Sequence, residues 1–296
     1  MIAPPGIGLA LGTNMQPGVA RRRQRSKDRP MEVVTSLGPA RLRVSGRSDT
    51  GRRRKRNEDF LFLRPKLGLF LVADGVAGRN AGKMASQLAA FSMNKFFEAT
   101  RQGHWPDQGL PVSGQSASEP QERLDSAIRK ANRDVYAAAT THPEHRNMST
   151  TLVATYLDGA AGMLHIGHVG DSRAYAVRAG AIEQLTRDHT LRNKARAALP
   201  GCTAEQLAQI PGSVLTGALG VAEQVQVDLR SIAVMPGDIY LLCSDGLTKM
   251  VEDRRILDAL LLRDAPGDMC DLLISLANGA GGRDNTTVAA LRFDPV

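Results

Sequence analysis

The chain is poor in the residues and patterns that mark several classes of protein. Its three cysteines, Cys202, Cys243 and Cys270, lie far apart and form no CxxC pair, which argues against a disulfide framework and against a structural zinc site. No stretch approaches the roughly 20 apolar residues of a membrane span. The start, MIAPPGIGLALG, lacks the basic residues and the cleavage pattern of a secretory signal. We therefore expect a cytoplasmic protein with no membrane span.

Basic residues are concentrated at the start of the chain. Residues 1–56 hold 14 Lys and Arg against 3 Asp and Glu, a net charge of +11, whereas the other 240 residues hold 24 against 27, a net charge of −3. Because the body is close to neutral, we do not expect it to bind nucleic acid. Residues 1–40 are rich in Pro, Gly and Arg without apolar periodicity, which indicates a basic, disordered N-terminal tail. A docking segment for an acidic partner, nucleic acid or anionic lipid is the alternative for this tail.

Short apolar runs separated by turn residues follow within residues 41–296. Three pairs of runs predict β-hairpins, with turns at 65–68, 158–159 and 179–180. The expected strands lie around Leu42 and Val44 and at residues 60–63, 69–72, 150–157, 162–169, 173–178, 181–185, 225–234, 238–243 and 286–292.

Apolar spacing predicts four helices, at residues 82–99, 121–140, 253–263 and 268–278. Their apolar positions include Met84, Leu88, Phe91 and Phe96 in the first helix and Leu124, Ile128, Ala131 and Val135 in the second. Residues 103–120 are expected to form a loop, and residues 187–220 to be irregular with a short helical piece near 203–209. Because strands come in hairpins and helices in pairs, the pattern favours antiparallel sheets covered by helices, an α+β fold.

Five short segments each place an acidic residue at the end of a β-like run, next to Gly or Asn. They are NED (57–59), VADG (72–75), GDSR (170–173), LLCSDG (241–246) and RDNTT (283–287). A carboxylate at a strand end is held at the rim of a sheet, and a neighbouring Gly lets the backbone turn and leaves its carbonyl free as a ligand. Converging carboxylates repel one another, and hard cations such as Mg²⁺ or Mn²⁺ neutralise them best. An isolated Asp-Gly such as Asp158-Gly159 is a turn, so the shared setting is what predicts a metal site.

Eight short motifs in a fixed order carry a family resemblance. They are RKRNED (54–59), VADG (72–75), STTLV (149–153), GDSR (170–173), LTRDH (185–189), LTGALG (215–220), SDGL (244–247) and DNTT (284–287). Over about residues 41–293 the chain resembles the metal-dependent type 2C protein phosphatases, the PPM family, in their compact bacterial form. The resemblance implies a four-layer αββα sandwich of two antiparallel β-sheets flanked by helix pairs. Residues 41–296 would form the phosphatase domain, with a flap at about 187–220.

The resemblance also implies a set of metal ligands, for two Mn²⁺ or Mg²⁺ ions. Asp74 would bridge the two cations. Asp245 and Asp284 would hold one of them. Glu58 and the carbonyl of Gly75 would help to hold the other, partly through water. A hydroxide bridging the two cations would then attack phosphorus.

Three further residues have roles implied by the same resemblance. Asp171, together with Asp245, would form a weaker site for a third cation. Asp59 would lie beside the ligands and orient them or their water. Arg54 would grip the substrate phosphate, for which a planar guanidinium that stays charged is suited. The neighbouring Arg52, Arg53, Lys55 and Arg56 are either a solvated face or a field that steers acidic substrates.

The chain departs from the family pattern at two places. Val76-Ala77-Gly78-Arg79 follows Asp74-Gly75 where bacterial relatives have Met-Gly-Gly-His, and Val76 stands where eukaryotic relatives often have a histidine that serves as a general acid. Gly217 stands where relatives often have Arg. The proposed ligands are unaffected by both departures.

His165 and His168 are three apart on one predicted strand, so their side chains should point to opposite faces of the sheet and should not form a metal-binding pair. His189, at the start of the flap, should have a structural role.

The function that the resemblance implies is hydrolysis of phosphoserine and phosphothreonine in phosphorylated protein substrates, opposing a bacterial Ser/Thr kinase. A catalytically silent scaffold is one alternative, but such proteins lose metal carboxylates and this chain keeps them. A phosphatase with another substrate, such as a small phosphoester, is a second, since the flap and loops set selectivity. A third and weaker alternative is a nucleic-acid-binding protein, for which only the basic tail gives support. We expect a monomer.

Overall fold

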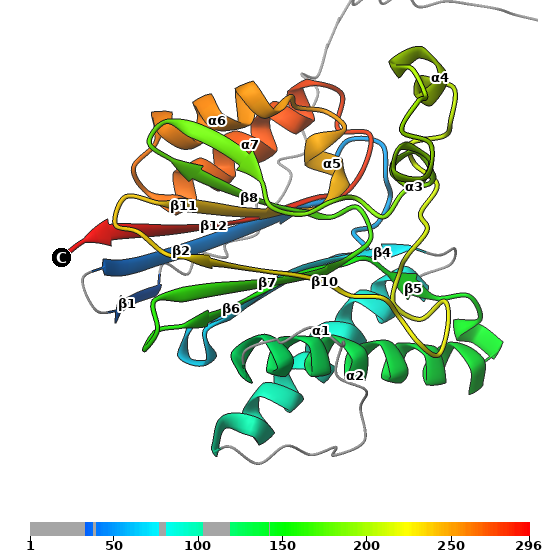
Figure 1. Ribbon diagram of the computed structural model, residues 1–296, viewed down its shortest axis with the longest axis horizontal. Helices are drawn as coiled ribbons and strands as arrows, with labels where there is room; N and C mark the ends of the chain where they lie inside the picture. The colour runs from blue at the N-terminus through cyan, green and yellow to red at the C-terminus, as the bar shows by residue number, and fades with distance from the viewer. Residues whose placement is uncertain (1–32, 38–39, 77–80, 103–118, 142) are drawn as a thin grey trace, which may run out of the picture.

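Two antiparallel β-sheets lie face to face in the computed structural model, which describes residues 33–37, 40–76, 81–102, 119–141 and 143–296 (Figure 1). The first sheet has the strand order β1-β2-β12-β11-β8-β9 and the second β10-β7-β6-β4-β3, with β5 pairing to β4. The strands of the first sheet are β1 (Val33–Leu37), β2 (Ala40–Asp49), β8 (Arg173–Arg178), β9 (Ala181–Gln184), β11 (Ile239–Cys243) and β12 (Thr286–Pro295). Those of the second are β3 (Asp59–Arg64), β4 (Leu69–Val76), β5 (Ser149–Thr150), β6 (Leu152–Asp158), β7 (Met163–Val169) and β10 (Asp228–Ala233).

Helices cover the outer face of each sheet, which completes the four expected layers. α1 (Ala81–Ala99) and α2 (Glu119–Thr141) pack on the second sheet, and α6 (Asp253–Leu262) and α7 (Pro266–Gly279) lie over the first (Figure 1). The short α5 (Asp245–Thr248) follows β11 directly. The αββα sandwich implied by the family resemblance is therefore confirmed.

The central strands are apolar on both faces because each lies between two layers. In β4, Phe70 and Val72 face the space between the sheets, whereas Leu69 and Leu71 face α1 and α2. β11 repeats this pattern, with Leu242 between the sheets and its neighbours under α6 and α7. Alternation along a strand sends successive side chains to opposite faces, so these two strands join three apolar cores into one packed unit.

The predicted hairpins form, each for a local reason. The turn between β6 and β7 is fixed by Asp158, whose Oδ1 accepts hydrogen bonds from the backbone N–H groups of Ala160 and Ala161. Between β8 and β9, Ala179 and Gly180 both adopt positive φ, 50° and 77°, as a tight two-residue hairpin turn requires. Asp158-Gly159 is thus a turn, as the sequence indicated.

The predicted apolar face of the first helix was right for Phe96, which is buried, and for Leu88, which is partly buried, but wrong for Met84 and Phe91. Met84 and Phe91 are 43% and 50% exposed, and the buried face of α1 consists mainly of small residues such as Ala85 and Ala89. Small side chains let the helix approach β4 closely, and the bulky Phe91 instead packs beside the rings of Phe60 and Phe62 at the edge of the sheet. In α2, by contrast, the four predicted positions are buried.

Two elements differ from the pattern read in the sequence. The segment 187–220 contains a second helix, α3 (Leu191–Ala198), in addition to α4 (Ala204–Ala208) near the predicted position. The helix α3 was missed because its sequence is strongly polar, but Thr190 caps it by accepting a hydrogen bond from the N–H of Asn193. At the other end of the chain, β1 pairs with β2 inside the segment expected to be tail. Residues 1–32, and the loop predicted at 103–120 up to residue 118, lie outside the described residues.

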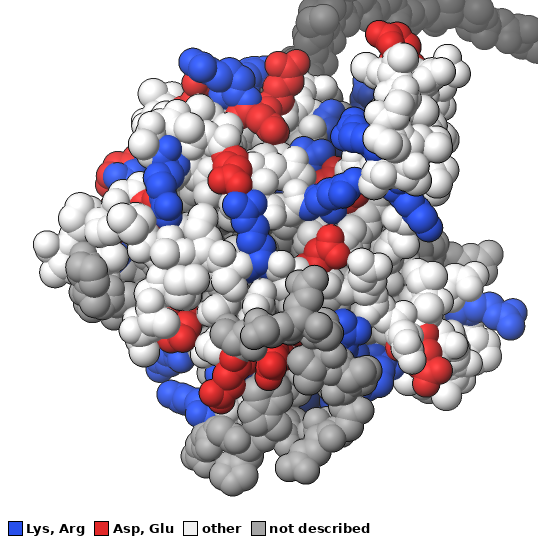
Figure 2. Space-filling model, in the orientation of Figure 1, with Lys and Arg blue, Asp and Glu red and all other residues white. Residues whose placement is uncertain are grey.

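Charges of both signs are interspersed on the surface of the described domain. Lys and Arg alternate with Asp and Glu across the face drawn in Figure 2, as the near-zero net charge of residues 57–296 predicts. Among the described helices, none combines the length and the apolar character that crossing a membrane requires.

The packing between the sheets gives a first prediction. Leu242→Ala removes a fully buried side chain from that layer and should lower the free energy of unfolding by about 2–5 kcal/mol, because the lost apolar burial is joined by the cost of a cavity. Urea denaturation followed by circular dichroism measures this. The matched control is Leu262→Ala on α6, where the side chain is 69% exposed and the cost should stay below about 0.5 kcal/mol. Equal effects of the two variants would contradict the core assignment.

Candidate metal centre

The predicted acidic residues converge on one cavity at the edge of the sandwich. The cavity has a volume of about 370 Å³, and every predicted site residue except Asp59 lines it. The lining residues that the sequence singled out are Arg54, Glu58, Asp74, Gly75, Asp171, Asp245 and Asp284. They come from the ends of strands in both sheets, so the face-to-face packing of the sheets brings them together.

Asp59 and Asp74 form a cross-strand pair below the cavity. Asp59 opens β3 and lies directly opposite Asp74 in β4, so the two carboxylates share one face of the sheet. Asp59 is buried, and its Oδ2 accepts a hydrogen bond of 2.8 Å from the hydroxyl of Ser244 in the other sheet. The same Ser244 hydroxyl accepts from the backbone N–H of Thr287, so Asp59 ties the two sheets together at this edge.

Asp245 and Asp171 enter the cavity from the first sheet and from the loop that leads into it. Asp245 follows β11 as the first residue of α5, and Asp171 follows β7 in a turn where Gly170 has a φ of 107°. Both side chains belong to buried residues. Lys249, one helical turn after Asp245, donates a hydrogen bond to Asp245 Oδ2.

Asn285 holds the loop that carries the basic side of the cavity. Its amide N–H groups donate to the carbonyls of Thr50 and Arg56, and its Oδ1 accepts from the backbone N–H of Glu58. The loop so fixed includes Arg54, whose guanidinium contacts Asp284 Oδ2 at 2.7 Å. Arg54 is therefore at the site, where its side chain is 54% exposed and bonded to a predicted ligand.

Glycine follows Asp74 and Asp245 because other backbones approach closely there. A Cβ at Gly75 would lie 2.2 Å from the carbonyl oxygen of Gly82 in α1, and a Cβ at Gly246 would lie 1.8 Å from that of Asn285. Neither glycine has a positive φ among the described residues, so the predicted reason, a backbone turn, was wrong for both positions. Close approach is instead what allows the start of α1 to lie against the strand end that carries Asp74.

Burial and mutual repulsion raise the pKa values of the central carboxylates. Burial, opposed by hydrogen bonds from Thr287 and Ser244, raises the pKa of Asp59 to about 7. Burial and the charge of Asp245 raise the pKa of Asp171 to about 7, although Lys249 opposes this. The pKa of Asp74 is raised well above its ordinary value, first by burial and then by the surrounding carboxylates. It is therefore unfavourable for these carboxyl groups to be ionised at the same time.

The residues present fit hard divalent cations. Asp59 Oδ1 and Asp245 Oδ1 are buried without a hydrogen-bond partner among the described residues, which is costly for a carboxylate unless a cation lies beside it. The cavity offers carboxylate and carbonyl oxygens, with no cysteine or histidine in its lining. Oxygen ligands of this kind suit Mg²⁺ and Mn²⁺.

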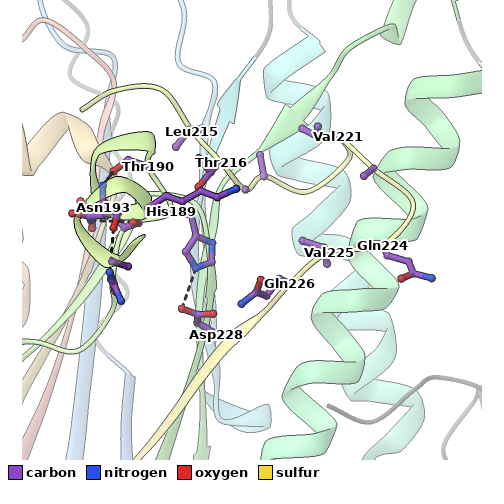
Figure 3. A pocket seen from close by; sticks show the side chains of 17 residues that line it. His189, Thr190, Asn193, Leu215, Thr216, Val221, Gln224, Val225, Gln226 and Asp228 are labelled. Atoms are coloured by element: carbon purple, nitrogen blue, oxygen red, sulfur yellow. Dashed lines mark hydrogen bonds and ion pairs between the residues drawn. The ribbon is translucent and has the colours of Figure 1, made fainter. Parts of the chain in front are cut away.

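A groove of about 450 Å³ lies beside this cavity under the flap, and His189 and Asp228 in its lining belong to a second group of potential ligands (Figure 3). His168, His189 and Asp228 have ligand atoms within 4.8 Å of one another. Several of their ligand atoms already have partners. His168 Nε2 bonds the carbonyl oxygen of Arg187, His189 Nε2 lies 3.2 Å from Asp228 Oδ2, and His189 Nδ1 accepts from the backbone N–H of Gly170. His189 thus anchors the start of the flap, as the sequence suggested.

The other histidine prediction is also confirmed. His165 lies on the α2 side of β7, stacked near Tyr156, whereas the neighbours Leu164 and Ile166 face the space between the sheets, as His168 does by alternation. His165 and His168 therefore do not share a site.

Sequence reasoning missed several residues of the centre. Asn285 stood in a recognised motif, but its role as a clamp on the loop 50–58 depends on long-range contacts. Lys249 could have been found from Ser244, which marks a helix start and so places Lys249 one turn after Asp245. Val76, at one departure from the family pattern, lines the cavity, while residues 77–80 lie outside the described part of the chain. Gly217, at the other departure, lines the groove beside His189.

Comparisons with known proteins agree with this geometry. A family model described as protein phosphatase 2C matches residues 49–265. The serine/threonine phosphatase Stp of Listeria innocua is 31% identical over 245 residues, which cover 82% of this chain and 92% of that protein. The protein phosphatase PhpP of Streptococcus pneumoniae is 30% identical, with 86% and 98% covered.

Solved structures show the same fold. The serine/threonine phosphatase PstP of Mycobacterium tuberculosis matches with a TM-score of 0.71 and 32% identity, covering 86% of this chain and 99% of that one. The catalytic domain of PstP in complex with two manganese ions matches with a TM-score of 0.68 and 31% identity, covering 86% and 98%. The residues matched by the family model, 49–265, span most of the folded domain. They include six of the seven carboxyl and arginine residues predicted for the site: Arg54, Glu58, Asp59, Asp74, Asp171 and Asp245. The chain therefore belongs to the protein phosphatase 2C family of serine/threonine protein phosphatases.

Proposed function

We propose that this chain hydrolyses phosphoserine and phosphothreonine in proteins by means of two divalent cations, Mn²⁺ or Mg²⁺, held in the carboxylate cavity. The observation that supports this most directly is the convergence of acidic strand ends around one cavity, where two buried carboxylate oxygens have no hydrogen-bond partner in the part of the chain that the structure describes. The bound cations would supply Lewis acidity and activate a water for attack on phosphorus. The chain's own residues hold, orient and balance these charges.

Each proposed ligand has a position that matches its role. Asp74 is central, because the charges of Asp171, Asp245 and Asp284 all act on it, and it is our candidate for the bridging ligand. Asp245 and Asp284 enter from the first sheet and are the candidates for holding one cation. Glu58 and the carbonyl of Gly75, which come from the second sheet's side, are the candidates for holding the other. Asp59 lies beneath, where its bond to Ser244 orients it toward Asp74.

Arg54 is the candidate for binding the substrate phosphate. Its guanidinium is at the exposed rim of the cavity and bonds Asp284 through one nitrogen, NH2. The remaining N–H donors of its planar fork are available to a phosphate in the cavity.

A bacterial Ser/Thr kinase in the cytoplasm is the expected source of the phosphorylated substrates, and the protein would act as a monomer.

The metal assignment predicts a selective loss of activity. Asp245→Asn removes a buried ligand charge and should lower the rate of hydrolysis of a phosphothreonine peptide in Mn²⁺ by about 100-fold or more. EDTA should abolish turnover by the unaltered protein. The matched control is Asp158→Asn, an aspartate in a hairpin turn, which should leave the rate unchanged. Turnover that survives both EDTA and the Asp245 change would exclude the metal mechanism.

The raised carboxyl pKa values predict how stability depends on pH without metal. Since Asp59 and Asp171 titrate near pH 7 when folded and near 4 when unfolded, the folded protein binds more protons between these values. The stability of EDTA-treated protein should therefore fall as pH rises from about 5 to 8, by at least about 3 °C in melting temperature. Saturating Mn²⁺ should remove this fall. Asp59→Asn should flatten the dependence, and a profile that rises toward pH 8 would contradict the assignment.

The phosphate assignment predicts a change in substrate binding. Arg54→Lys keeps the charge but loses the planar fork, so KM for the phosphothreonine peptide should rise about tenfold. Arg53→Lys, at the adjacent exposed position, is the control and should leave KM unchanged. Steady-state kinetics at saturating Mn²⁺ separate the two parameters, and an unaltered KM in the Arg54 variant would remove Arg54 from the phosphate site.

A further inference from the structure

Lys249 brings a second positive charge, besides that of Arg54, to the carboxylate cavity. It lines the cavity, and its ammonium donates to Asp245 Oδ2. The contact follows from local geometry, because Asp245 begins α5 and Lys249 is four residues later, one turn along the same face. The pairing therefore depends on the backbone of α5 and not on the conformation of a long loop.

The charge of Lys249 acts on more than one carboxylate. It interacts favourably with Asp171 and Asp74 as well as with Asp245. About 44% of its side chain is exposed, while its ammonium bonds the buried Asp245, so the charge reaches the carboxylates from a partly solvent-exposed position. Asp171 and Asp245 are the pair that a third divalent cation would need, and both already interact with this ammonium.

The charge balance of the site supports two divalent cations. Six carboxylates belong to the centre when Asp59 is included: Glu58, Asp59, Asp74, Asp171, Asp245 and Asp284. Arg54 and Lys249 offset two of these charges, which leaves four, the charge that two divalent cations neutralise. A third cation at Asp171 and Asp245 would lie next to an ammonium and would have to displace it from Asp245.

We propose that Lys249 serves as a built-in cation that takes the place of a third divalent ion at Asp171 and Asp245, so that this phosphatase binds two divalent ions and not three. Lys249 is thereby a positioning residue, which holds Asp245 toward the two-cation side of the cavity. The inference deepens the proposed function and rests on its two-cation centre.

Counting bound Mn²⁺ tests the proposal directly. Full-length protein, stripped with EDTA and dialysed, is titrated with Mn²⁺ by calorimetry and by electron paramagnetic resonance of free Mn²⁺. The unaltered chain should bind two ions. Lys249→Met keeps the length of the side chain and removes its charge, and it should gain a third ion with affinity at least about tenfold above any weak binding of the unaltered chain. Lys249→Arg keeps the charge and should still bind two.

Two further variants separate this role from a simple surface ion pair. Asp171→Asn combined with Lys249→Met should return the count to two, because the third site loses its own ligand. Lys95→Met, at an exposed lysine on α1, should change nothing. A count of three in the unaltered chain, or of two in Lys249→Met, would overturn the proposal while leaving the two-cation phosphatase intact. An unaltered chain that binds no Mn²⁺ would refute the proposed function as well.

Discussion

Repulsion among buried carboxylates is the constraint on which the rest of this structure depends. Asp59, Asp171 and Asp245 are buried and Asp74 is half-buried within one small region, and burial together with mutual charge raises the pKa values of Asp59, Asp74 and Asp171. A chain free to relax would separate them, since isolated buried charges are among the most costly groups in a protein. The scaffold must therefore hold these groups against their own repulsion.

The central strands supply that restraint. β4 carries Asp74 at one end, β11 leads directly into Asp245, and both strands are packed between two apolar layers. Their positions are fixed along most of their length, so the acidic residue at the end of each has little freedom to retreat. Ser244 and Thr287 add a direct polar link between the sheets at the same edge, through Asp59. Packing in the apolar cores thus offsets the repulsion among the carboxylates. The acidic residues are held in place before any ligand binds, at a cost in the stability of the fold.

Much of the fold and of the centre could be predicted from the sequence, for identifiable reasons. Hairpins with strong turn residues, such as Asp158-Gly159, and helices with bulky apolar positions, such as those of α2, are specified locally. The buried face of α1 was not fully predicted, because the small residues that permit close packing give only a weak hydrophobic pattern. The helix α3 was missed because its sequence is polar. The proposed ligands stood out in strand-end motifs, and the structure brings them to one cavity, whereas the clamp by Asn285 arises from contacts more than 200 residues apart in sequence.

The two basic residues of the cavity differ in what they are able to do. Arg54 belongs to a loop held by Asn285 and the carbonyl of Gly282, and its fork reaches the rim where a phosphate would enter. Lys249 is the C-terminal cap of the short α5 and bonds Asp245, the first residue of that helix, so its charge is tied to a proposed ligand. In the proposed reaction the guanidinium would exchange Asp284 Oδ2 for the substrate phosphate, while Asp284 Oδ1 keeps its hydrogen bond from the N–H of Asn285. An ammonium one turn from Asp245 has no such exchange partner in the proposed reaction. The chain therefore divides its positive charge into one group suited to recognising phosphate and one suited to balancing the metal centre.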